Sequence, residues 1–534
     1  MKGKDIANHG SSNPGSWMVD ALCHARSIAG CGKNNSCRFK KKPYNSCMSS
    51  KSPSRGSTNT QKPGEGAGEA ESLPMQLVRN MIQSLENGEF PPGSKLPSIR
   101  QSIRLSGFSQ GTVVEAYRIL LDMGRIQSVP GGGYYAVHQD LQSPRPEQSR
   151  IVQRLSLDPA LDRALSLGNR SVQAPFGLAV PSEDMLPVSA LKRCLTEAFR
   201  SEEIHTYSFP PGHNELRKQI ALRYRQAGVD LGWQELILTG SATEAAYVVL
   251  RELVREGDLV ALESPCYSGF LHQVKKFPLR ILEVPVDPML GMDVDLLEQR
   301  LKKGARPRLI ITVPNFHNPT GALLEPARRR KLLDLAQEFD FYILEDDVYG
   351  GIHHGAKRSP PLIALDRSRV FLVSSFAKSI VPSMRLGWIA APPEFHDAAL
   401  ERLRALSLGN SKLTEETLTL FLARRHFDRH LRKLRKESRI RIAEFRKRIL
   451  AWPVDIRVSS PQGGFWLWLE LPAGFDALEL QERALKRGIS VSPGTLFSPS
   501  GGYRNYLRIN CALPSTKSIL GHLDVLGALV ADMV

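Results

Sequence analysis

The stretch FLVSSFAKSIVPSMRLGW, residues 371–388, is the most informative part of this sequence for its fold. A short apolar run ends in a turn of small residues that presents one lysine, Lys378, and a proline, an arginine and a glycine follow. A lysine that forms a Schiff base needs a pocket with donors for an anionic group on both sides, here Ser375 and Arg385. The pattern S-x-x-K is weak by itself, because a lysine after serines is usually solvated. Its companions in the sequence therefore carry the interpretation.

Length and charge limit the possible classes. A chain of 534 residues, 42% of them hydrophobic, predicts two or three domains with a large core. The formal net charge of +17 favours a polyanionic partner, although a basic surface is often only a solvated one. We expect a cytoplasmic protein without a membrane segment, because long apolar runs and the order of a secretory signal are both missing.

The seven cysteines show no paired spacing, so we expect neither a disulfide framework nor a metal site. Residues 1–72 are rich in Ser, Gly, Asn and Lys without periodicity and predict a disordered leader, in which Met18 and Met48 are possible later starts. A helical block follows at 73–137, and then a linker at 138–170.

Residues 171–534 alternate apolar strands with helices. The strand candidates are LVALES (259–264), RLIITV (308–313), FYILED (341–346) and VFLVSS (370–375). Such continuous apolar strands indicate a mostly parallel sheet covered on both faces. From about residue 405, a long charged helix and the segments FWLWLEL and YLRINCA predict a smaller α/β domain.

The block at 73–137 predicts three helices and a hairpin. Leu77, Met81, Ile82 and Leu85 recur at helical spacing, Ser98 can cap a second helix, and a third opens at Ser109. RIQSVPGGGYYAV then indicates a hairpin with a glycine turn. The strings P-P-G-x-x-L-P-S-x-R, S-x-x-T-V-x-x-A-Y and G-G-G-Y resemble the winged helix-turn-helix of GntR-type regulators.

This resemblance implies binding to double-stranded DNA, with a helical protein-interaction module as the alternative. Amides and hydroxyls at the start of the third helix suit phosphate, and Arg100 suits the backbone or a groove. Gln110 stands where relatives commonly carry arginine, which favours adenine over guanine contacts. The implied DNA-binding residues are Lys95, Ser98, Arg100, Ser109, Gln110, Thr112, Tyr117 and Gly132.

The companions of Lys378 come in a fixed order over about 300 residues: G-S-x-T, E-x-P-x-Y, N-P-T-G, D-x-x-Y, S-x-x-K and L-R-I-N. Together they resemble fold-type I aminotransferases that use pyridoxal 5'-phosphate, an α/β fold with a large, mostly parallel mixed sheet and a smaller C-terminal domain. The implied cofactor-binding residues are Ser241, Ala242, Thr243, Tyr267, Asn318, Asp346, Tyr349, Ser375, Lys378, Arg385 and Tyr207.

Individual roles follow from the same resemblance. Asp346 would pair with the pyridine nitrogen, while Asn318 and Tyr349 would donate to the phenolic oxygen. Tyr267 would stack on the ring, unless it is a core tyrosine, and Tyr207 would reach the phosphate of the neighbouring subunit of a homodimer. Asp347 is expected to face solvent or to cap the loop.

Two further features concern ligands. Arg508, in YLRINCA, would hold the carboxylate of a substrate or effector through a bidentate pair. The basic helix around 424–448 is either a solvated face or a second DNA-contacting surface.

A GntR-type winged helix joined to an aminotransferase-like domain is the architecture of the MocR family. The resemblance, from about residue 73 to the end, implies a transcription regulator that carries pyridoxal phosphate on Lys378. An amino compound would displace the lysine and alter the domain geometry. The alternatives are a sensor of the cofactor alone, or a working aminotransferase with a DNA-binding appendage.

Overall fold

The computed structural model describes residues 73–86, 89–90, 94–122, 125–129, 132–136, 151–152 and 172–534. The expected leader at 1–72 and most of the expected linker at 138–170 lie outside these ranges. Among the helices within them, none combines the length and the apolarity needed to cross a membrane.

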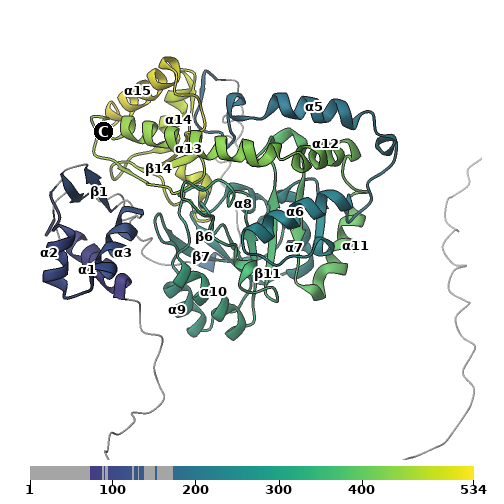
Figure 1. Cartoon of the computed structure of the whole chain (residues 1–534), viewed down its shortest axis with the longest axis horizontal. Helices are drawn as coiled ribbons and strands as arrows, with labels where there is room; N and C mark the ends of the chain where they lie inside the picture. The colour runs from purple at the N-terminus through teal and green to yellow at the C-terminus, as the bar shows by residue number, and fades with distance from the viewer. Residues whose placement is uncertain are drawn as a thin grey trace, which may run out of the picture. The chain divides into compact units, whose positions relative to one another are not determined.

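The N-terminal block has the three helices and the hairpin that the sequence predicts (Figure 1). Ser98 begins the second helix with a capping box: its Oγ accepts from the Gln101 N–H at 3.4 Å, and its own N–H donates to the Gln101 carboxamide at 2.9 Å. Its elements are α1 (Leu73–Glu86), α2 (Ile99–Ser106), α3 (Gln110–Asp122), β1 (Ile126–Val129) and β2 (Gly133–Ala136).

This block has an apolar core of its own, built from the predicted helical positions. Leu77, Met81 and Leu85 of α1 are buried against Val113 and Leu120 of α3. The hairpin is antiparallel, with Ile126 opposite Ala136, so that both residues close the same core.

The large domain is built on a nine-stranded sheet. Its strand order is β3-β7-β6-β9-β10-β11-β12-β5, and β8 pairs with β7. The strands are β3 (Ile151–Val152), β5 (Leu236–Thr239), β6 (Leu259–Ser264), β7 (Arg280–Asp287), β8 (Gly291–Met292), β9 (Pro307–Thr312), β10 (Tyr342–Asp346), β11 (Val370–Ser375) and β12 (Gly387–Ala390).

The sheet is mixed and mostly parallel, as predicted. β7, β6, β9, β10 and β11 pair in parallel, whereas β12 runs antiparallel to both β11 and β5. Every residue of β6, β11 and β12 is buried, so both faces are covered. The helices are α5 (Val188–Ala198), α6 (Asn214–Gln226), α7 (Ala242–Leu253), α8 (Ser268–Val274), α9 (Val294–Lys302), α10 (Pro326–Glu338), α11 (His396–Leu406) and α12 (Lys412–Ala423).

The segment expected as a linker contributes to this sheet. Ile151 and Val152 form β3 and pair antiparallel with Leu282 and Ile281 of β7. Two apolar residues in a polar stretch gave too short a signal to predict a strand.

The smaller domain is a four-stranded antiparallel sheet, in the order β13-β14-β17-β16, with helices packed on it. Its elements are α13 (His426–Ile449), β13 (Arg457–Val458), β14 (Trp466–Glu470), α14 (Ala477–Leu485), β16 (Ser492–Pro493), β17 (Tyr506–Asn510) and α15 (Lys517–Ala531). A further strand, β15 (Ile489–Ser490), pairs with β4 (Ala174–Pro175).

The charged helix expected from about residue 405 is two helices. α12 and α13 are separated at Arg424 and Arg425, where Arg425 takes a left-handed conformation with φ of 56°. Part of the charge on α13 is internal, because Arg441 forms an ion pair with Asp184 and Arg435 donates to the Gly351 carbonyl at 2.7 Å.

One glycine sets how closely β12 approaches the start of α7. A Cβ at Gly387 would lie 2.5 Å from the Ser241 carbonyl carbon and 2.6 Å from the Ala242 nitrogen. Both are backbone atoms, so a side chain here would force the strand and the helix apart.

Gly387→Ala is therefore expected to lower the free energy of unfolding by about 1–3 kcal/mol, as overpacked positions do. Urea denaturation followed by circular dichroism measures the change. Gly521→Ala is the matched control, because, apart from the backbone of its own helix, no atom of the described residues lies within 4 Å of its added Cβ, and alanine favours the helix α15. Equal stability of Gly387→Ala and the wild type would contradict the assigned packing.

Candidate functional site

Lys378 follows the carboxyl end of β11 and points into the molecule. Its Nζ donates to the Ala179 carbonyl at 2.9 Å. Burial lowers the pKa of Lys378 to about 8; the positive charges of Arg508 and Arg385 lower it too, and Asp346 opposes them. The amine is thus partly neutral near physiological pH, the form required of a nucleophile.

Asp346 ends the neighbouring strand β10, close enough to Lys378 for each to affect the other's pKa. Its Oδ1 accepts from the Val348 N–H at 3.1 Å. Burial raises the pKa of Asp346 to about 7, because the carboxylate lies in a low-dielectric site. A cationic partner would stabilise the ionised form.

Asn318, Tyr349 and Arg508 are joined to one another by hydrogen bonds. Arg508 Nη1 donates to Asn318 Oδ1 at 2.9 Å, and Asn318 Nδ2 donates to the Tyr349 hydroxyl at 3.5 Å. The Tyr349 ring is held edge-on against Trp466, with centroids 4.6 Å apart. These residues, predicted from separate motifs, therefore form one group.

Tyr267 adjoins this group. Burial raises its pKa, the charge of Asp346 adds to the effect, and Arg508 and Arg385 oppose it. Its ring lies edge-on to Phe270 at 5.7 Å, at the start of α8. Tyr267 is partly buried and packs against the core of the large domain, so its stacking on the cofactor ring stays a prediction.

The predicted phosphate donors gather around Gly387. Ser241 is the N-cap of α7, where its Oγ accepts from the Glu244 N–H at 3.1 Å, and Ala242 and Thr243 form the first turn. Ser375 lies opposite Gly387 in the β11–β12 ladder, and the backbone of Gly387 is against Ser241. Free amides at a helix N-terminus are anion donors.

Several site residues carry no sequence signal. The segment 177–180 supplies carbonyls to the pocket: Gly177 accepts from Arg508 Nη2 at 2.6 Å, and Ala179 accepts from Lys378. Ser492 Oγ lies 3.3 Å from Arg508 Nη2. Backbone acceptors depend only on where the chain passes, so no residue pattern marks them.

The expectation for Asp347 is wrong. Its side chain is 1% exposed and accepts hydrogen bonds from Asn315 Nδ2 at 3.0 Å and the Tyr224 hydroxyl at 3.3 Å. Arg358 forms an ion pair with it. Successive residues at a strand end point to opposite sides, so Asp347 points away from the side that Asp346 faces and into a buried network.

Tyr207 does not join the site within this chain. Its side chain is 70% exposed and packs beside Phe209, itself 62% exposed, with ring centroids 5.8 Å apart. The segment that carries it is fastened by buried Glu415, which accepts hydrogen bonds from Ser208 and from the His213 N–H.

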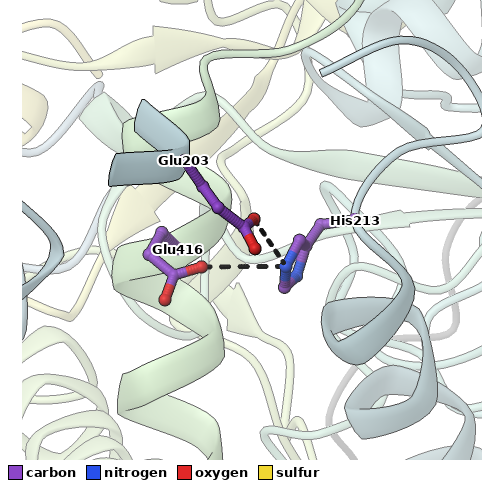
Figure 2. A group of neighbouring side chains, drawn as sticks. All are labelled: Glu203, His213 and Glu416. Carbon is purple, nitrogen blue, oxygen red and sulfur yellow. Dashed lines mark ion pairs between the residues drawn. The ribbon is translucent and has the colours of Figure 1, made fainter. Parts of the chain in front are cut away.

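Figure 2 shows a second group near this segment, formed by Glu203, His213 and Glu416. His213 Nε2 lies 3.9 Å from Glu203 and 3.7 Å from Glu416, a spacing that could accommodate a cation. However, His213 Nδ1 already accepts the Leu216 N–H at 3.4 Å, and Lys412 already pairs with Glu203 at 2.9 Å. Both features favour an ion-pair cluster over a metal site.

Most of the predicted DNA-binding residues are exposed or partly buried. Lys95, Arg100, Ser109 and Gln110 are exposed, and Ser109 Oγ caps α3 by accepting from the Thr112 N–H at 3.2 Å. Ser98 is exposed at the start of α2, Thr112 is partly buried, and Gly132 lies in the hairpin turn.

Tyr117 is a correction to that prediction. It is 1% exposed, and its hydroxyl bonds Ser102 Oγ and the Pro97 carbonyl, each at 2.6 Å. The buried face of α3 includes it, so Tyr117 positions α2 and does not reach DNA.

Residues 179–523 match the family described as aminotransferase class I and II. The chain is similar to two uncharacterized HTH-type transcriptional regulators of Escherichia coli K12. YjiR is 33% identical over 85% of this chain and 98% of its own length, and YdcR is 32% identical over 82% and 94%. The chain belongs to the MocR-type family of transcriptional regulators. The crystal structure of LysN, the α-aminoadipate aminotransferase of Thermus thermophilus, is 26% identical, with a TM-score of 0.65, over 70% of this chain and 95% of that one.

This MocR-type regulator uses pyridoxal phosphate as its cofactor, and the pocket fits it. Lys378 and Asp346 would hold its carbonyl and ring nitrogen, and the α7 N-terminus with Ser375 and Arg385 would hold its phosphate. Arg508 Nε is buried without a hydrogen-bond partner among the described residues, so this guanidinium keeps one donor without an acceptor. When bound, the cofactor supplies an aldehyde that condenses reversibly with amines.

The rate at which the cofactor-free regulator attaches the cofactor should rise with pH through about 8, because the Lys378 amine loses its proton there. The amine of an ordinary lysine loses its proton only at about pH 10.4. The midpoint should move upward in Arg508→Gln, since the arginine charge lowers the pKa of Lys378. Borohydride reduction followed by mass spectrometry measures attachment, and Lys378→Ala should show none. A midpoint close to that of an ordinary lysine would contradict the environment assigned to Lys378.

Proposed function

We propose that this regulator binds operator DNA through the winged helix-turn-helix as a homodimer, and that a carboxylate-bearing amino compound controls the binding. The proposal rests on the presence of both Lys378 and Arg508 in the same pocket. A lysine with a pKa of about 8 suits amine exchange. A buried arginine whose hydrogen-bond partners among the described residues are all neutral suits a carboxylate.

Arg508, Lys378 and Asp346 would each have a different role in this response. Arg508 would orient the effector carboxylate by exchanging its bonds to Asn318 and Gly177 for a bidentate pair. Lys378 would take or release a proton at Nζ, and Asp346 would stay ionised beside a cationic ring nitrogen. The effector can change DNA binding only if it binds one arrangement of the two domains more tightly than another.

Support for the homodimer comes from the exposed pair of aromatic side chains. Tyr207 and Phe209 are 70% and 62% exposed on a segment that Glu415 fastens to α12. Exposed, ordered aromatic side chains are typical of protein interfaces.

A working aminotransferase is the second candidate, because Lys378, Asp346, Asn318, Tyr349 and Arg508 form a complete set in one pocket. Rapid spectral conversion of the cofactor to its amine form by an amino acid would favour this candidate. Conversion much slower than that of aminotransferases would favour regulation. A sensor of the cofactor alone is the third candidate.

Arg100→Ala should weaken operator binding by about 1–3 kcal/mol if Arg100 contacts a base, or reduce the salt slope by about one if it contacts phosphate. Fluorescence anisotropy at several salt concentrations measures both quantities. Arg330→Ala removes the same charge from an exposed position of α10 and should change neither. Unchanged affinity and slope in Arg100→Ala would remove Arg100 from the interface.

Arg508→Ala should abolish the effector-dependent change in operator affinity, because a buried charged pair contributes several kcal/mol, on the order of 2–5, to ligand binding. Operator affinity without effector and covalent attachment to Lys378 should persist. Arg504→Ala is the control, since Arg504 is exposed and pairs with Asp476. A full response in Arg508→Ala would exclude a carboxylate held by this arginine and favour the sensor of cofactor alone.

A further inference from the structure

A second cavity, of about 700 Å³, lies beside the candidate cofactor pocket. It is bounded by α6, the start of α13 and the loop that carries Arg358, and it reaches the ends of β10 and β11. Its lining includes Ser375 but none of Lys378, Asp346, Asn318 or Arg508. A volume of this size is typical of small-molecule sites, which span about 300–1,000 Å³.

The cavity is strongly positive. Among the described residues, five cationic side chains line it against two carboxylates, Asp347 and Asp428, which leaves a net charge of +3. Burial and the charge of Arg435 lower the pKa of His353, so this histidine is left out of the charge count. The cations are Arg223, Lys357, Arg358, Arg432 and Arg435.

The two carboxylates are already subtracted in this net charge, and each lies against one of the arginines. Asp347 is already engaged by Arg358, Asn315 and Tyr224. Asp428 is 3.5 Å from Arg223, and its side chain is 41% exposed to water, which weakens the attraction.

The arginines keep unused donors. Nε of Arg223 and Nε of Arg358 are buried without hydrogen-bond partners among the described residues. Burial and the nearby charge of Arg358 lower the pKa of Arg435 to about 10, which shows that these cations repel one another. A bound anion would offset this repulsion between the cations.

One wall of the cavity is aromatic. Tyr224, Phe376, Trp388 and Phe427 line it. The Arg223 guanidinium lies 5.0 Å from the Phe427 ring centre, and that of Arg358 lies 5.4 Å from the Tyr224 ring centre. Phe427 and Tyr224 orient the two guanidinium groups, and Phe376 and Trp388 complete the apolar wall.

We propose that this cavity is a binding site for an aromatic phosphate monoester, separate from the cofactor pocket. Guanidinium groups bind phosphate oxygens in pairs, and the rings would pack against the aromatic body of the ligand. The proposal rests on the cavity and its charges and does not depend on the effector or the operator.

The test titrates phenyl phosphate into the full-length regulator loaded with cofactor, by isothermal titration calorimetry. One phenyl phosphate per chain should bind without changing the absorbance of the bound cofactor. Phenol, which lacks the anion, should not bind measurably, and inorganic phosphate, which lacks the ring, should bind more weakly.

Two variants locate the site. Arg223→Gln and Arg432→Gln should each weaken binding about tenfold, the loss expected for one charge-assisted contact. Arg432 is exposed at the rim, so its replacement leaves the core intact. Arg429→Gln removes the same charge from the exposed side of α13, outside the cavity, and should bind as the wild type does.

Three results would overturn the proposal. The first is no binding of phenyl phosphate at millimolar concentration, and the second is displacement of the cofactor by it. The third is equal weakening by Arg429→Gln, which would show attraction to the general surface charge. If inorganic phosphate bound as tightly as phenyl phosphate, the ring would contribute nothing to binding, and the site would not be specific for an aromatic ligand.

Discussion

The buried ion pair between Asp347 and Arg358 is the constraint on which the site depends. Asp347 also accepts from Asn315 and Tyr224, its N–H donates to Val373 at 2.9 Å, and its carbonyl accepts from Ser374 Oγ at 3.0 Å. One residue therefore joins the ends of β10 and β11. Breaking such a pair from one side typically costs about 3–5 kcal/mol, because a buried charge loses its partner. Asp346 and Lys378 are positioned by the strand ends that this pair fixes.

The same pair separates two environments. On one side, Lys378 and Asp346 share a pocket whose burial shifts both pKa values toward neutrality, to about 8 and about 7. On the other side, arginines line a cavity whose carboxylates are too few to balance them. The first environment suits reversible proton exchange, and the second suits a fixed negative charge.

The N-terminal block, residues 73–136, is held together by local contacts instead. Its core consists of side chains from residues 77–136 alone, and its caps and hairpin are local. Tyr117 shows how local the packing is: its hydroxyl bonds Ser102 and Pro97, and so joins α3 to α2 and to the turn before it. A block closed in this way can present Arg100 and Gln110 on its surface without help from the large domain.

The sequence by itself determined the features that depend on short-range pattern. Apolar runs placed β6 and β11 at the predicted residues, helical spacing and Ser98 placed α1 and α2, and spaced motifs named Lys378, Asp346, Asn318 and Arg508 as one site. Only the tertiary structure decided how long-range neighbours use those residues. It turned Asp347 inward onto Arg358, buried Tyr117, added Ile151 and Val152 to the sheet edge, and brought the carbonyls of Gly177 and Ala179 to Arg508 and Lys378. The physical reason is that burial and backbone acceptors depend on which distant segment packs nearby, and periodicity along the chain carries no record of that.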